Sequence, residues 1–71
     1  MTRNSFTSTG ILGLDRSIDL LLDRLRSPEA GKACEAAAQI QGIRTALVSI
    51  DRDRYGQTVH DLAELIAERD R

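Results

Sequence analysis

Three acidic side chains near the carboxyl end of the chain are the first residues whose types and spacing could do chemistry. Asp61, Glu64 and Glu68 lie three and four residues apart, which places them on one face of a helix. Carboxylate oxygens suit a divalent cation, but a helical site also needs acidic partners on a facing helix. The second expected helix offers only Glu29 and Glu35 as glutamates. The pattern therefore favours a solvated acidic face, and we expect no bound metal.

The remaining reactive side chains lack the partners that catalysis requires. His60 directly precedes Asp61, and adjacent helical residues do not face each other, so the two form no dyad. Cys34 is the only cysteine and lies among alanines, where it behaves as a small apolar side chain. Gly10 and Gly13 lack the lysine and the flanking pattern of a phosphate-binding loop. We therefore expect no catalytic residue and no cofactor, which excludes an enzyme.

Three arginines in the second half of the chain suggest an anion site instead. Arg44 interrupts an apolar band, and Arg52 and Arg54 follow it along the same expected helix. In a symmetric dimer they could converge with their copies on a phosphate or a nucleotide. They could also pair with Asp51 and Asp53, and the alternating charges favour this second interpretation.

An apolar stripe sets the architecture that positions these side chains. Its spacing of three, four, three, four and three residues is that of one helix face in a bundle. No segment alternates with period two beside hairpin turn residues, so strands are not expected. The stripe consists of Ala33, Ala36, Ile40, Ile43, Leu47 and Ile50.

The apolar spacing predicts three helices. They span about residues 14–26, 28–54 and 59–69, and the central one is apolar over a wide arc. A helix with two apolar sides is usually covered on both. Gly42 lies inside the central helix and marks either a close helix crossing or a kink.

Local signals set the expected ends of the central helix. Ser27 followed by Pro28 is a favoured helix start, because serine caps the amino terminus and proline fits the first helical position. Gly56 is a suitable stop after the helix. Thr58 and Asp61 resemble a capping box that begins the third helix.

The chain is expected to form one small domain that needs a second copy. Residues 1–10 are polar and predict a flexible N-terminal arm, and residues 11–71 form a single helical domain. The alternative for the arm is that Phe6 docks onto a partner or a second copy. A core of this size seldom supplies more than about 3–5 kcal/mol. We therefore expect an all-α fold in which a long central helix is flanked by two short antiparallel helices. A homodimer or larger oligomeric helical bundle would complete it.

The charge balance bears on the class of partner. Ten basic and eleven acidic side chains give a net charge of −1, which does not favour nonspecific binding to DNA or to an anionic membrane. The third expected helix presents acids where a DNA-recognition helix needs basic and amide side chains. Apolar runs are too short for a membrane span or a signal-peptide core. We expect a cytoplasmic protein.

These observations lead to a non-catalytic module that binds a larger protein partner as a regulator, adaptor or inhibitor, of the kind that phages and mobile elements encode. One alternative is an oligomer that sequesters a nucleotide or another anion in Arg-lined pockets between subunits. A DNA-binding regulator is the second alternative. The expected contact residues combine apolar and arginine character at outward positions: Arg16, Leu20, Arg24, Arg44, Arg52, Arg54 and Tyr55.

Overall fold

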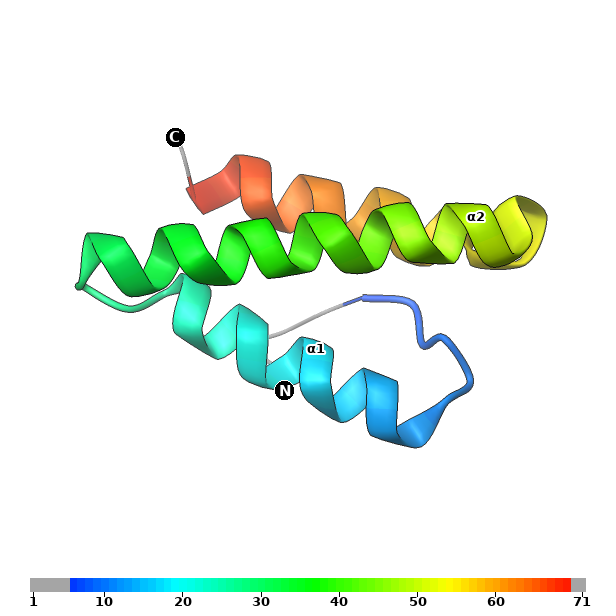
Figure 1. Cartoon of the computed structure of the whole chain (residues 1–71), viewed down its shortest axis with the longest axis horizontal. Helices are drawn as coiled ribbons and strands as arrows, with labels where there is room; N and C mark the ends of the chain where they lie inside the picture. Colours follow the sequence, from blue (N-terminus) through cyan, green and yellow to red (C-terminus); the bar gives the residue numbers. More distant parts are fainter. Residues whose placement is uncertain (1–5, 70–71) are drawn as a thin grey trace.

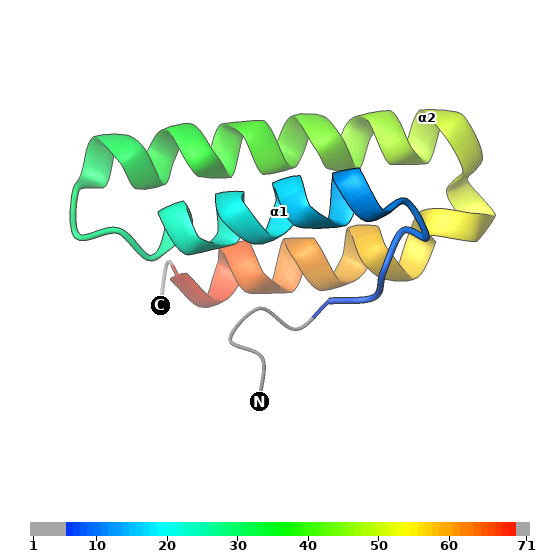
Figure 2. The same ribbon diagram turned by 90° about the horizontal axis from the view of Figure 1, so that it is seen from below.

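The chain folds into two helices joined by a short loop. The computed structural model describes residues 6–69, in which α1 spans Leu12–Leu25 and α2 spans Ala30–Arg69. No residue of the described range lies in a strand, so the predicted all-α class is confirmed. None of the helices in this range is long and apolar enough to cross a membrane. α1 packs against both halves of α2 (Figures 1 and 2).

α2 is sharply bent at Asp51. The backbone of this residue has φ −160° and ψ 92°, outside the helical region, while helical geometry continues on both sides. The bend divides α2 into a first arm, residues 30–50, and a second arm, residues 52–69. The two arms lie side by side and run in opposite directions (Figures 1 and 2).

A side-chain hydrogen bond explains the position of the bend. The backbone N–H of Arg54 donates to Oδ1 of Asp51 at 3.1 Å. This is the bond that an N-cap aspartate makes with the third residue of a helix, while its own backbone stays extended. Asp51 therefore begins the second arm as its cap.

The prediction of three separate helices is not confirmed, because the second and third expected helices form one bent helix, α2, and its bend lies before the expected turn. Gly56, expected as a stop, lies inside the second arm with helical geometry, and Gly10 is the only described glycine with a positive φ. Gly42 neither kinks the first arm nor allows a close crossing, because a Cβ added there would meet nothing within 4 Å. The turn instead uses the capping side chain of Asp51.

The start of α2 is also displaced from its prediction. α2 begins at Ala30, after the expected Ser27–Pro28 start. The Ser27 hydroxyl accepts a hydrogen bond from the Glu29 N–H at 3.2 Å, which holds the loop in a turn. The carbonyl of Glu29 then accepts the first helical hydrogen bond, from Ala33 at 3.1 Å.

The core lies between α1 and the two arms of α2. The apolar stripe of the first arm is buried as far as Leu47, apart from the half-buried Ile43, but Ile50 is 72% exposed because it directly precedes the bend. In place of Ile50, the second arm contributes two buried apolar residues to the core. The buried apolar residues are Ile18, Leu21, Leu22 and Leu25 from α1, Ala33, Ala36, Ile40 and Leu47 from the first arm, and Tyr55 and Leu62 from the second.

Residues 6–10, which we call the strap, cross the second arm before they enter α1 (Figure 2). Phe6 is half-buried and packs against the core. The hydroxyl of buried Thr58 donates to the carbonyl of Thr7 at 2.7 Å. This part of the expected flexible arm is thus held by contacts, and residues 1–5 lie outside the described residues.

Truncation of the buried stripe tests the core. Replacing Ile40, which is fully buried, with alanine should lower the free energy of unfolding by about 2–5 kcal/mol, because it leaves a cavity. Ile50→Ala is the matched control and should change it by less than about 0.5 kcal/mol. Urea denaturation monitored by circular dichroism measures both. Equal losses of stability would contradict a structure in which Ile40 is buried and Ile50, directly before the bend, is exposed.

Removal of the cap tests the bend itself. Asp51→Ala should cost about 0.5–2 kcal/mol of stability, because the Arg54 N–H loses its acceptor, whereas Asp51→Asn should retain most of it. Asp53→Ala, in the same charged run, serves as the control in thermal denaturation. A cost as large for Asp53→Ala as for Asp51→Ala would refute the capping role.

Candidate protein-binding surface

The outer face of α1 exposes two large apolar side chains in line. Leu12 is 69% exposed and Leu20 is 61% exposed, on the side of α1 opposite its buried residues. Exposed Arg16 lies between them, four residues from each, so the three side chains follow one side of successive turns. We call Leu12, Arg16 and Leu20 the outer stripe. Arg24 continues this line at the last turn of α1.

A groove adjoins the outer stripe at Leu20. It lies between α1 and the first arm and has a volume of about 520 Å³. Its apolar lining comes from Leu20, Leu21 and Ala36, and side chains of both charges surround this lining. The polar and charged lining residues are Asp23, Arg24, Ser27, Lys32, Glu35 and Gln39.

Some of the charges at the groove are paired within the chain. Asp23 lies 3.6 Å from Arg26, and Lys32 lies 3.6 Å from Glu29. These pairs are exposed and contribute little to stability. The groove therefore carries side chains of both charges beside its apolar lining.

The seven predicted contact residues do not form one surface. Arg16, Leu20 and Arg24 share the outer side of α1, and the structure brings Leu20 and Arg24 together at the groove. The other four residues belong to α2. Leu12 is a contact candidate that the sequence prediction missed, because it precedes the expected helix start. Its spacing from Arg16 and Leu20 is the signal that could have identified it.

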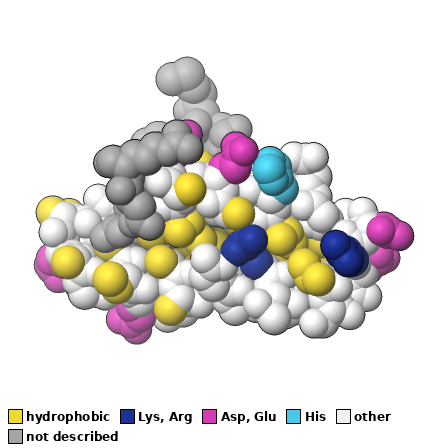
Figure 3. All heavy atoms as spheres, turned by 90° about the horizontal axis from the view of Figure 1, so that it is seen from above, with side chains coloured by type: hydrophobic (Ala, Val, Ile, Leu, Met, Phe, Trp, Pro, Cys, Tyr) yellow, Lys and Arg dark blue, Asp and Glu magenta, His cyan; other side chains and the backbone are white. Residues whose placement is uncertain are grey.

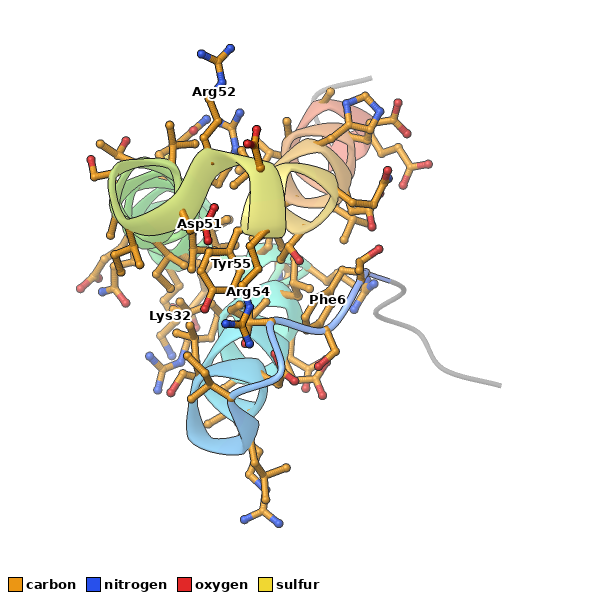
Figure 4. All side chains as sticks on the ribbon, turned by 90° about the vertical axis from the view of Figure 1, so that its right-hand side faces the viewer. Phe6, Lys32, Asp51, Arg52, Arg54 and Tyr55 are labelled. Carbon is orange, nitrogen blue, oxygen red and sulfur yellow. The ribbon has the colours of Figure 1, made fainter. Side chains whose placement is uncertain are left out.

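The structure disperses the arginines of α2. The half-buried Arg44 donates from Nε to the carbonyl of Val59 at 3.1 Å and from its guanidinium to Gln41, so it fastens the first arm to the second. Arg52 and Arg54 extend to different sides of the bend (Figure 4). Within one chain, the three arginines therefore do not converge on a common ligand.

Tyr55 is one of the predicted contact residues, but the structure buries it. It is only 7% exposed and belongs to the core at the bend. The guanidinium carbon of Arg54 lies 5.5 Å from the centre of the Tyr55 ring, within the range of a cation–π contact. The two side chains lie beside each other in Figure 4. Both residues therefore stabilise the bend, because Tyr55 fills the space beneath it.

The face formed by the two arms of α2 is the second apolar region. Figure 3 shows hydrophobic side chains gathered along the seam between the arms, interrupted by basic side chains. Val48 is its large exposed residue, at 41%. Beside Val48 lies a shallow hollow of about 260 Å³ that Arg44 and Val59 also line.

The acidic face of the second arm forms no metal centre in the structure. Among the described residues, no group of three or more His, Cys, Asp or Glu side chains could hold a metal ion. Glu64 lies 3.2 Å from His60, and Asp61 accepts hydrogen bonds from Thr7 and Gln57. The carboxylate of Asp61 is therefore hydrogen-bonded to Thr7 of the strap and to Gln57.

Two hydrogen-bonded carboxyl groups hold the strap. The Ser8 hydroxyl is the main cause that lowers the pKa of Asp15 below 3.8; burial opposes this effect, and hydrogen bonds from the backbone and hydroxyl of Thr9 add to it. The Thr7 hydroxyl, 2.7 Å away, is the main cause that lowers the pKa of Asp61. Perturbed carboxyl groups often mark reactive sites, but here the main cause of each lowered pKa is a neutral hydroxyl group of the strap.

Comparison with known proteins finds no match to a family model, to a curated protein or to a solved structure. The function must therefore be inferred from the surfaces of this chain.

Acid should weaken the strap and the stability that depends on it. Because the folded-state pKa of Asp15 and Asp61 lies below the ordinary value of 3.8, their contribution is present above that pH and is lost as the pH falls through the folded-state values. The melting temperature of the Asp15→Asn, Asp61→Asn double variant should therefore fall less between pH 5 and about pH 2.5 than that of the wild type. Asp53→Asn is the control. If the melting temperature of the double variant fell as steeply with pH as that of the wild type, this account would be contradicted.

Proposed function

We propose that this chain is a non-catalytic protein-interaction module that binds a larger protein through the outer stripe and the adjoining groove. The supporting observation is that Leu12 and Leu20 are exposed in line on a helix whose opposite face is already buried. Single exposed leucines are ordinary. Two in line with an arginine, beside a groove with an apolar lining, are typical of a surface that another protein covers.

The energetics of burial support this use of α1. Full burial of a leucine contributes about 1.5–3 kcal/mol relative to its exposed state. Two leucines that are each more than 60% exposed therefore offer a contribution of several kcal/mol to association. Arg16 lies between them and supplies a long apolar stem and five hydrogen-bond donors, which is why arginine is common at the centre of interfaces.

The character of the groove indicates the kind of partner surface. Neither Arg24 nor Glu35, both of which line it, forms an ion pair within the described part of the chain. A partner that inserts an apolar ridge, such as one side of a helix, and that carries both charges beside this ridge would pair with both residues. We propose such a partner rather than a nucleic acid.

The other hypotheses have less support. A nucleotide-sequestering oligomer would need arginines from several chains, because Arg44 is occupied and Arg52 and Arg54 diverge. A DNA-binding regulator would need a basic surface, which the net charge of −1 does not favour. A homo-oligomer remains part of our proposal, with the apolar seam of Figure 3 as the surface that a second copy would cover.

Site-specific photo-crosslinking tests the docking surface. A benzophenone side chain placed at Leu12 or at Leu20 should capture the same partner from a lysate of the source cell. The same probe at Ala38, which is exposed on α2 and lines neither the groove nor the hollow beside Val48, is the matched control and should not. Excess unlabelled wild type should abolish the adduct, whereas unlabelled Leu20→Glu should compete at least about tenfold less well.

Circular dichroism should show that Leu20→Glu is folded, because Leu20 is exposed. Equal capture from Ala38, or equal competition by Leu20→Glu and the wild type, would reject the outer stripe as the docking surface.

A further inference from the structure

We propose that the strap is a releasable cover whose distal part, Phe6 and Thr7, opens from the second arm while the part near α1 remains folded. In the closed state that we observe, the strap covers the seam between α1 and the second arm. This seam lies on the opposite side of α1 from the groove of the proposed docking surface (Figure 2). The inference is independent of the proposed partner.

The distal part of the strap is fastened by only a few long-range contacts. The N–H and the hydroxyl of Thr7 both donate to Oδ2 of Asp61, at 2.8 and 2.7 Å. The carbonyl of Thr7 accepts the hydroxyl of Thr58 at 2.7 Å. Phe6 adds its apolar contact with the core. All three hydrogen bonds join residues more than 50 positions apart and depend on Thr7, so they can be lost together.

The proximal part of the strap is fastened locally instead. The N–H and hydroxyl of Thr9 donate to Oδ1 of Asp15, at 2.9 and 2.8 Å, and the Ser8 hydroxyl donates to the same carboxylate. Gly10 follows with φ 82°, a conformation that glycine adopts without strain. These bonds stay within seven residues at the start of α1, so they do not require the second arm. They make this part the fixed base from which Phe6 and Thr7 open.

Opening would uncover apolar surface between α1 and the second arm. The seam already contains a hollow of about 220 Å³ whose apolar lining is Leu22, Leu25 and Leu65. Phe6 packs against the core cluster to which Leu22 belongs and against which Leu65 also packs. Release of Phe6 would expose further apolar surface in this seam. Opening of the distal strap would therefore leave part of the core cluster uncovered.

Amide hydrogen exchange measured by NMR at increasing urea concentrations tests the proposal. The Thr7 amide should exchange through an opening that is insensitive to urea, at least about tenfold faster than the amides of Leu22 and Leu62, which should follow global unfolding. Asp61→Asn should speed exchange at Thr7 by at least about threefold and leave Thr9 unchanged, because only the distal contacts are weakened.

Thr58→Val is a second variant that removes the hydroxyl donated to Thr7, and it should have the same selective effect. Asp53→Asn is the matched control and should change neither amide. The proposal is overturned if the Thr7 amide of the wild type is unprotected, or if its exchange follows global unfolding. It is also overturned if Asp61→Asn speeds Thr7 and Thr9 equally.

Discussion

The bend at Asp51 is the constraint on which the rest of the structure depends. A straight helix of 40 residues would be about 60 Å long. The whole described chain extends only 34 Å along its longest axis, because the second arm returns along the first. α1 then meets apolar side chains from both arms. Without the return, the inner face of α1 would meet the first arm alone.

Several contacts of different kinds maintain this return. Asp51 caps the second arm, Tyr55 fills the space beneath the bend, and Arg44 joins the arms farther along. A cap contributes about 0.5–2 kcal/mol, which is comparable to one hydrogen bond but less than the burial of a large core residue. The cap therefore determines where α2 bends, while the apolar contacts of the arms supply most of the stability.

The same packing leaves the outer side of α1 exposed, which is the side that we propose a partner covers. Its inner side is fully used by the core, and one flank borders the strap. The leucines of its outer stripe lie outside the core of the single chain and are mostly exposed. Exposed leucines lower the solubility of a small protein. Burial against the proposed partner would be a physical reason for their presence.

Much of the fold could be predicted from the sequence, because the signals were local. The three-four spacing identified the buried face as far as Leu47, and the same periodicity placed Leu20 on the outside of α1. The bend was misplaced because the charged run after Ile50 also fits a solvated helix end, and because Gly56 is the more usual stop. A single capping aspartate inside such a run has no distinctive pattern.

The candidate site and the strap were predictable to different degrees. Arg16, Leu20 and Arg24 followed from helical spacing, whereas Leu12 was missed because the predicted helix began too late. The hydrogen bonds between Thr7 and Asp61 span 54 residues, so no local sequence pattern could indicate them. Tyr55 was assigned to the surface because its burial depends on the bend.

A distance measurement between the ends of α2 tests the bend most directly. Spin labels on the native Cys34, which is exposed, and on Ala67→Cys should give an electron–electron distance of roughly 15–30 Å, from an interhelical spacing of 8–10 Å plus the reach of the labels. Dilution with unlabelled protein removes distances between copies. A distance near 50 Å, the length of about 33 residues of straight helix, would contradict the return of the second arm.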